Sequence, residues 1–223
     1  MVVHAENIKK EFIRKGRETN VLLAVDTCNI EFRENMLTVV KGRSGGGKST
    51  LLNMLSGILV PTVGRVFYDG NDIYLMDDDK LSEFRNRNIG FVPQGKSAIA
   101  SLNVLENVLL PELLYSGRNE DRALFLMEKF GIEGLKEAMP SELSGGELRR
   151  MSIARALMRS PKVLFADEPT GDLDDENTRI VFKALRDIAD NGCAVFMVTH
   201  EQDALEYADR LYKMDAGVLS GCR

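Results

Sequence analysis

The chain has 223 residues, of which 44% are hydrophobic and 28% charged, and its formal net charge is −5 at pH 7. These values are ordinary for a soluble globular protein with one sizeable core, and the negative charge argues against a basic nucleic-acid-binding surface. No apolar run approaches the roughly 18–20 residues that span a bilayer, so we expect no transmembrane segment and any membrane role to come through a partner.

Strands and helices alternate in the first part of the chain. Strands are indicated by short apolar, β-branched runs between turn signals, and helices by apolar residues at three- and four-residue spacing. In chain order, the predicted elements are strands at residues 2–8 and 21–32 joined by a polar hairpin loop from Arg14 to Asn20, a buried strand at 36–41, a helix at 48–56 that stops at Gly57, a strand at 63–68, a polar helix around 79–87 and a strand at 89–92.

From about residue 95 to 160 the pattern is mainly helical, and then the alternation of strand, helix and strand returns. The predicted elements are helices at 104–114, 120–130 and 147–158, a strand at 163–166, a helix at 176–189 and a strand at 194–199.

This order predicts an α/β fold with a parallel-sheet core, an antiparallel β subdomain at the amino terminus and an inserted α-helical subdomain. We expect a single domain over 1–223. Residues 1–94 and 161–223 form its α/β core with the β subdomain, and residues 95–160 form the helical subdomain.

The cysteines and the amino terminus indicate a cytosolic protein. Cys28, Cys193 and Cys222 are few, odd in number and without metal-type spacing, so we expect reduced thiols and neither a disulfide framework nor a zinc site. The first residues, MVVHAE, lack the basic-then-apolar pattern of a signal peptide.

A glycine-rich loop follows the buried strand at 36–41 and opens the next helix. Glycines let backbone N–H groups turn inward around phosphate oxygens, and the helix adds its positive amino-terminal end. Lys48 is expected to reach the β- and γ-phosphates of a nucleotide, and Ser49 to ligate Mg²⁺. The strand before the loop and the helix after it favour the phosphate-binding loop of a P-loop NTPase with a RecA-like core over a simple glycine-rich turn. The loop reads Gly42-Arg43-Ser44-Gly45-Gly46-Gly47-Lys48-Ser49, with Thr50 after it.

Two acids end the apolar strand at 163–166. Asp167 and Glu168 emerge at the carboxyl end of this strand, where open parallel sheets bind their ligands. Asp167 is expected to hold Mg²⁺ through a water, and Glu168 to polarise the attacking water as a general base. An acid pair at a strand end also fits a plain helix cap, and it is the phosphate loop upstream that favours the catalytic interpretation.

A third glycine motif, Ser144-Gly145-Gly146-Glu147, lies between the phosphate loop and the acidic strand. Its glycines allow close approach of a phosphate, Ser144 can hydrogen-bond a γ-phosphate, and Glu147 is expected to open a helix that points at the nucleotide. Ser144 with Glu147 three residues later also matches a capping box. Both interpretations can hold together, because the cap builds the helix end that binds phosphate.

With these three motifs in this order, the chain resembles the ATP-binding subunits of ABC transporters. In that family the Ser-Gly-Gly segment of one subunit closes over ATP held by another, so the resemblance implies a homodimer in the ATP-bound state, with ATP and Mg²⁺ as cofactors. One position departs from the family pattern, because Glu147 stands where Gln is usual.

Four further residues match single-residue positions of the family. The resemblance implies that Gln94 touches Mg²⁺ or water, that His200 contacts the γ-phosphate, and that Asp174 is the acid of the segment after Glu168. Phe12 matches the aromatic residue that stacks on adenine. Each has an ordinary alternative: a solvated loop glutamine, a capping histidine, a helix cap at Asp174 and a core phenylalanine.

The runs 103–108 and 167–174 look like those of the lipoprotein-releasing and macrolide-export ATPases. This subclass implies an ATPase that powers a transmembrane permease, peripheral on the cytoplasmic face of the membrane and without direct nucleic-acid contact. After His200 we expect no room for the carboxyl-terminal regulatory domain of sugar importers. Two alternatives stay open: a soluble ABC-type ATPase acting on nucleic acid or ribosomes, and a P-loop kinase. A P-loop kinase does not need the Ser-Gly-Gly motif, so the presence of that motif argues against the kinase.

Overall fold

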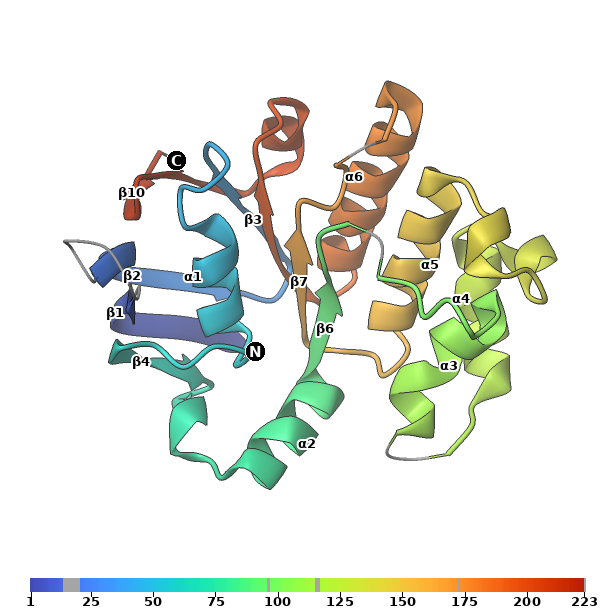
Figure 1. The fold of residues 1–223 in the computed structure, drawn as a ribbon, viewed down its shortest axis with the longest axis horizontal. Coiled ribbons are helices and arrows are strands. Elements are labelled where there is room, and N and C mark those ends of the chain that lie inside the picture. Colours follow the sequence, from blue (N-terminus) through green and yellow to red (C-terminus); the bar gives the residue numbers. More distant parts are fainter. Residues whose placement is uncertain (14–20, 96, 115–116, 172, 223) are drawn as a thin grey trace.

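The computed structural model describes residues 1–13, 21–95, 97–114, 117–171 and 173–222, so the expected hairpin loop at 14–20 lies outside the described residues. The described chain forms two sheets with helices around them (Figure 1). This is the predicted α/β architecture of a P-loop NTPase, with an antiparallel sheet at the amino terminus. None of the helices in the described ranges is long and apolar enough to cross a membrane.

The larger sheet carries the parallel core. Its strand pairs are parallel from β9 through β3, β8 and β7 to β6, and only β10 joins its edge antiparallel. In spatial order the strands are β10 (Val218–Gly221), β9 (Arg210–Asp215), β3 (Met36–Lys41), β8 (Ala194–Thr199), β7 (Val163–Asp167) and β6 (Ile89–Val92).

The smaller sheet is antiparallel throughout and forms the amino-terminal part of the fold. Its first strand runs five residues beyond the predicted end at 8, because its pairing with the second strand continues to Ile13 past two irregularities in register. In spatial order its strands are β2 (Val21–Arg33), β1 (Val2–Ile13), β4 (Val63–Tyr68) and β5 (Asn71–Asp72).

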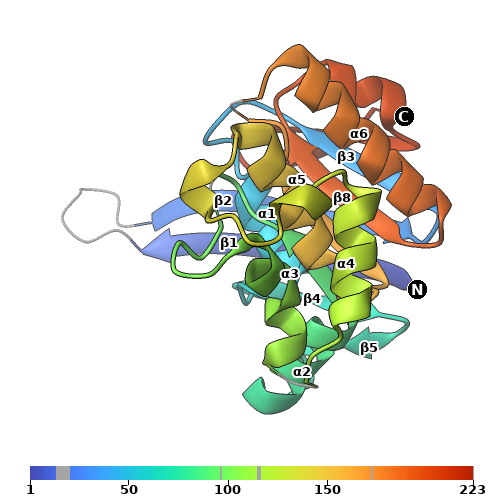
Figure 2. The same cartoon turned by 90° about the vertical axis from the view of Figure 1, so that its right-hand side faces the viewer.

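The main helices fall close to their predicted positions. Figure 1 shows α3, α4 and α5 gathered at the end of the molecule far from β1 and β2, and Figure 2 presents these three helices toward the viewer with α6 above them. They are α1 (Lys48–Leu55), α2 (Asp78–Asn88), α3 (Val104–Leu113), α4 (Glu120–Lys129), α5 (Gly145–Ala156) and α6 (Asp175–Asp190).

Helix α5 begins at Gly145, two residues before the predicted start at Glu147. The reason is a capping box, in which Ser144 is the N-cap. The Ser144 hydroxyl accepts the Glu147 backbone N–H, and the Glu147 carboxylate accepts the Ser144 backbone N–H. The glycines of the motif are therefore the first turn of the helix and not a loop before it.

The parallel strands alternate between two hydrophobic cores. In β8, Val195 and Met197 join the core under α3 to α6, while Phe196 and Val198 join the core around α1. Successive side chains of a strand point to opposite faces, so one buried strand supplies both cores. On the α1 side, the ring of Phe196 lies 4.9 Å from that of Phe32 and 5.8 Å from that of Phe165, centroid to centroid.

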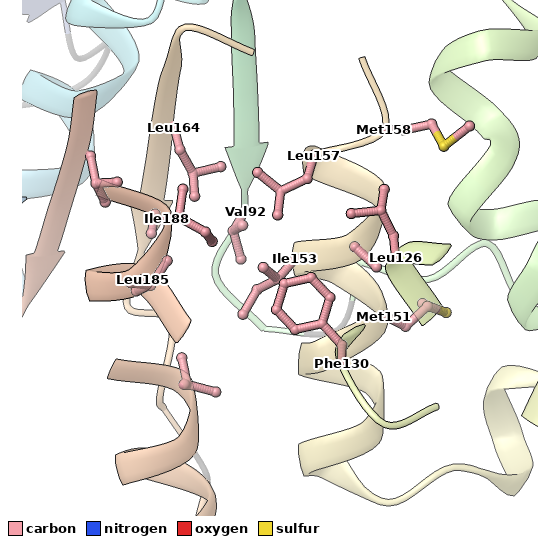
Figure 3. Close-up of a cluster of buried hydrophobic side chains, with 14 of the residues drawn as sticks. Val92, Leu126, Phe130, Met151, Ile153, Leu157, Met158, Leu164, Leu185 and Ile188 are labelled. Carbon is pink, nitrogen blue, oxygen red and sulfur yellow. The ribbon is translucent and has the colours of Figure 1, made fainter. Parts of the chain in front are cut away.

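The core under the helices joins α4, α5 and α6 to the sheet. Leu185 and Ile188 of α6 meet Ile153 of α5, and Leu157 directly after that helix, across Val92 at the end of β6 (Figure 3). Apolar contact is therefore continuous from the parallel strands to the helices that separate β6 from β7 in the sequence. This fixes the position of α5, and with it the Ser144 motif, relative to the sheet.

Replacing Phe196 by Ala is expected to cost about 3–5 kcal/mol of unfolding free energy, because it leaves a cavity between two other rings. Urea denaturation followed by circular dichroism measures this loss. The matched control is Phe125→Ala, since Phe125 is 54% exposed and its loss should cost under about 1 kcal/mol. Equal losses in the two variants would contradict the placement of Phe196 at the centre of the core.

Candidate functional site

The glycine-rich loop at 42–47 joins the carboxyl end of β3 to α1. The Gly42 N–H donates to the Thr199 carbonyl at 3.2 Å, and the Gly217 N–H donates to the Gly46 carbonyl at 3.0 Å, so neighbouring segments hold the loop from two sides. Gly47 has a φ of 99°, and a side chain there would overlap the Ala24 carbonyl oxygen. Only glycine fits at this position, which lies next to the first turn of α1.

Lys48 turns its ammonium group back over the loop. Its Nζ donates to the carbonyls of Gly42 at 3.0 Å and Arg43 at 3.1 Å, and it lies 3.1 Å from Glu168 Oε1. The Lys48 side chain is 5% exposed. A buried cation is stable only when paired, and here the pairing joins the loop to the end of β7.

Ser49 and Asp167 meet beside this cation. The Ser49 hydroxyl donates to Asp167 Oδ1 at 3.0 Å. Burial raises the pKa of Asp167, and the hydrogen bond from Ser49 opposes that shift. A hydroxyl and a carboxylate oxygen side by side are hard ligands of the kind that Mg²⁺ takes. In the described parts of the chain, no group of three or more His, Cys, Asp or Glu side chains could hold a metal alone, so further ligands would have to come from nucleotide and water.

Glu168 links the ends of β7 and β8. Its Oε2 accepts the His200 backbone N–H at 3.2 Å and lies 2.8 Å from His200 Nδ1. Its backbone φ is 45°, a left-handed value that a non-glycine residue adopts only at a cost of about 1–3 kcal/mol. The chain therefore turns sharply after Asp167, and the Glu168 carboxylate lies between Lys48 and His200. The His200 side chain itself is 61% exposed.

A cavity of about 510 Å³ opens over the glycine loop, a volume in the usual range for a small-molecule site. A second cavity of about 550 Å³ lies beside it and shares Gln94 and Glu168 with it. His200 lines the second cavity. The first is lined by Phe12, Leu22, Leu23, Ala24, Ser44, Gly45, Gly47, Lys48, Ser49, Thr50, Gln94, Glu168, Ala216 and Gly217.

Most of the residues predicted for the nucleotide are thus brought together. Gly42 and Gly46 hold the loop backbone, and Asp167 lies behind Ser49, buried at 6% exposure. Phe12 also lines the cavity; this residue is 37% exposed, and the centroid of its ring lies 5.3 Å from Lys10 Nζ.

Sequence analysis missed two segments of this cavity. Residues 22–24 of β2 and the turn residues Ala216 and Gly217 between β9 and β10 line it but carry no motif. Tertiary contacts place them there. The Asp26 N–H donates to the Gly217 carbonyl at 2.8 Å, and the Gly217 N–H donates to the Gly46 carbonyl of the glycine loop. The signal for that turn in the sequence would be the two strands that flank it, β9 and β10, and their apolar pattern is weak.

The Ser144 motif lies elsewhere. Ser144, Gly145 and Gly146 line neither of the two cavities around Lys48 and Glu168. Ser144 and Gly145 are exposed on the surface. Glu147 accepts the Ser144 hydroxyl at 2.7 Å, and this hydrogen bond lowers the pKa of the Glu147 carboxyl. Within one chain, then, the motif does not reach either cavity.

Asp174 also lies outside these two cavities, at the start of α6. It is the N-cap of that helix, and its Oδ1 accepts the Asn177 backbone N–H at 2.8 Å. Hydrogen bonds from Asn177 lower the pKa of the Asp174 carboxyl. Its neighbour Asp172 in the same segment lies outside the described residues.

Helix α5 is tied to the segment that carries Gln94. The Arg149 guanidinium donates to the Pro93 carbonyl at 2.8 Å, directly before Gln94. Further along the helix, Arg155 donates to the Ser97 carbonyl at 2.9 Å and to the Ser97 hydroxyl at 2.7 Å. A displacement of α5 would therefore act on the chain on both sides of Gln94.

Comparison with known proteins identifies the family. The family described as ABC transporter matches residues 25–171. The lipoprotein-releasing system ATP-binding protein LolD 2 of Chlorobaculum tepidum is 35% identical, over 100% of this chain and 93% of that protein. The macrolide export ATP-binding/permease protein MacB of Campylobacter fetus is 36% identical over 100% of this chain, which spans 35% of MacB.

Solved structures agree. The dimeric post-hydrolysis state of the ATP-binding cassette MJ0796, bound to ADP and Pi, is 31% identical with a TM-score of 0.89, over 99% of each chain. These relatives do not favour a P-loop kinase or an ATPase acting on nucleic acid or ribosomes. The chain therefore belongs to the ABC transporter family, and it is an ATP-binding, ATP-hydrolysing subunit similar to the LolD and MacB proteins.

Proposed function

We propose that this chain powers a transmembrane permease of the lipoprotein-releasing or macrolide-export kind through ATP-driven dimerisation. The observation that carries the proposal is the division of the site. Lys48, Ser49 and Glu168 surround one cavity, whereas Ser144 lies outside it with an exposed helix end. Such a helix end is suited to a phosphate held by another copy of the chain.

In each subunit the glycine loop and Lys48 bind the phosphates of ATP, and Phe12, which lines the same cavity, stacks on the adenine. Phosphate oxygens would replace the carbonyls of Gly42 and Arg43 as acceptors for the Lys48 ammonium group. The roles proposed for the remaining residues of the loop, Ser44, Gly45, Gly46, Gly47 and Thr50, are backbone and hydroxyl contacts to the same phosphates.

The adjacent oxygens of Ser49 and Asp167 are the proposed ligands of Mg²⁺, with Gln94 as a further contact. When bound, Mg²⁺ neutralises charge on the β- and γ-phosphates. Burial of Asp167 favours pairing its carboxylate with a cation, since an unpaired buried charge is costly.

Hydrolysis is assigned to Glu168. Its carboxylate takes a proton from water as the water oxygen attacks the γ-phosphorus, and the bond from the γ-phosphorus to the bridging oxygen breaks to release ADP. Release of Lys48 to the phosphates frees Glu168 Oε1 for that water, while His200 holds Oε2 and extends toward the γ-phosphate.

The second half of each composite site is the partner's motif. Ser144, Gly145 and Gly146 of one subunit close over the γ-phosphate bound by the other, with Asp174 near the interface. Binding of ATP favours the closed homodimer, and loss of the γ-phosphate opens it. The dimeric state described for MJ0796 supports this arrangement.

The same proposal divides the chain into a core of 1–94 and 161–223 and a helical subdomain of 95–160. The permease docks near Gln94 and the helical subdomain, at the cytoplasmic face of the membrane. The hydrogen bonds from Arg149 and Arg155 to the segment around Gln94 support a transfer of motion between α5 and that docking region.

Lys48→Ala is expected to weaken ATP binding roughly 10–100-fold, the effect of losing about 1.5–3 kcal/mol of charged hydrogen bonding, and to nearly abolish hydrolysis. Fluorescent-ATP titration and phosphate release measure the two effects. Lys183→Ala, on the exposed face of α6, is the matched control. Near-normal hydrolysis in Lys48→Ala would remove the phosphate-loop assignment.

Glu168→Gln keeps the shape of the side chain but loses the base, so hydrolysis should fall roughly 10²–10⁴-fold while ATP still binds. ATP and Mg²⁺ should then hold a long-lived dimer, detected by size-exclusion chromatography with light scattering, and ADP should not. If the variant binds ATP yet stays monomeric, both alone and with the permease, the dimer proposal is wrong.

A further inference from the structure

Gly146 faces another part of its own chain. A methyl group at this position would overlap the side-chain oxygen of Asn177 and would lie 2.7 Å from Asn177 Cγ. A contact of that length forces something to move. A methyl group at Gly146 would therefore displace the Asn177 amide in the first turn of α6, so Gly146 and Asn177 occupy adjoining space within one chain.

The Asn177 amide is fully used. Its Nδ2 donates to both carboxylate oxygens of Asp174, at 3.0 Å each, and its Oδ1 accepts from Arg150 Nη1 at 3.1 Å. Asp174 belongs to the segment after Glu168, and Arg150 belongs to the second turn of α5. All three contacts have a charged group as the partner of the amide, which makes them stronger than hydrogen bonds between neutral groups.

We propose that Asn177 is a positioning residue that locks the Ser144–Gly146 helix end to Asp174, so that the two present one rigid surface to the second subunit. This inference rests on the proposed ATP-driven homodimer. Asn177 itself lines neither cavity around Lys48 and Glu168, so it acts on the partner's nucleotide only through Gly146, Arg150 and Asp174.

Loss of this amide would leave a gap beside Gly146 and would release Asp174 and Arg150 from each other. The helix end would then have to become ordered during dimerisation, and the entropy lost in that step would weaken association. In the native chain the helix end is already ordered by folding. The binding of ATP to one subunit should not change, because the groups that surround the nucleotide cavity stay in place.

The test places Asn177→Ala in the Glu168→Gln background and measures dimerisation against protein concentration at saturating ATP and Mg²⁺. Dimerisation should weaken about tenfold or more, the effect expected from losing hydrogen bonds to charged groups. Fluorescent-ATP affinity of the monomer should stay within about twofold. Asn177→Asp should weaken dimerisation at least as much, because it replaces the donor to Asp174 with a second carboxylate oxygen.

The matched control is Asn191→Ala, which removes an asparagine from the opposite end of α6 where its amide donates to the Asp187 carbonyl. It should leave dimerisation unchanged. Thermal melting of all the variants verifies that they are folded. If Asn177→Ala and Asn191→Ala both lose dimerisation in proportion to their loss of melting temperature, the loss reflects general stability and contradicts a positioning role.

A rescue experiment separates positioning from general stability. Gly146→Ala should weaken dimerisation because its methyl group displaces Asn177, and adding Asn177→Ala should make that methyl tolerated. The double variant should therefore dimerise no worse than Asn177→Ala alone. If the two losses multiply instead, the methyl group is excluded by the partner's nucleotide alone and the inference is wrong.

The outcomes for the two proposals are distinct. If Glu168→Gln dimerises with ATP and Asn177→Ala leaves that dimerisation unchanged, only the role of Asn177 is overturned. If Glu168→Gln does not dimerise, even with its permease, the proposed ATP-driven homodimer is wrong, and so is the positioning role of Asn177 that rests on it.

Discussion

The structure depends on the pairing of buried charges at the carboxyl ends of β3 and β7. Lys48, Asp167 and Glu168 are each less than 8% exposed, and an unpaired charge at such a position would cost several kcal/mol. The Lys48–Glu168 ion pair and the Ser49–Asp167 hydrogen bond satisfy them across two strands that are not neighbours in the sheet. The strand order, with β8 between β3 and β7, is what brings these groups within reach.

The same cluster explains why the site suits a polyanion. The Lys48 ammonium group is bound by two loop carbonyls and Glu168. Phosphate oxygens are better partners for that cation than neutral carbonyls, because the interaction is between full charges in a partly buried place. A ligand that binds the Lys48 ammonium group also changes the partners of Glu168, because the two side chains form an ion pair. In the proposed mechanism, nucleotide binding and the freeing of the Glu168 carboxylate are therefore coupled.

Sequence analysis recovered the fold because its strongest signals were local. The glycine loop between a buried strand and a helix, and the acids at the end of β7, each specify their own backbone geometry, and the structure has them where the sequence predicts. Helix α5 begins two residues before its predicted start, because the capping box between Ser144 and Glu147 makes Gly145 and Gly146 part of the first turn. Strands β5, β9 and β10 were missed because they are short or partly exposed, so their apolar pattern is weak.

The rest of the site is set by tertiary contacts that no local pattern contains. Residues 22–24 and Gly217 reach the cavity because β2 and the β9–β10 turn pack against the glycine loop. The position of Asn177 beside Gly146 results from the packing of α6 on α5, through the core that Figure 3 shows. From the sequence, Asn177 is an ordinary residue in the first turn of a helix.

The central claim is that one nucleotide is bound by two copies of this chain. The most direct test is a structure of the Glu168→Gln variant with ATP and Mg²⁺, determined with the permease if the permease is needed for assembly. The account predicts that each ATP lies between Lys48 of one subunit and Ser144 of the other, with the Ser144 hydroxyl on the γ-phosphate. An ATP held by one subunit alone, with Ser144 of every copy remote from nucleotide, would contradict it.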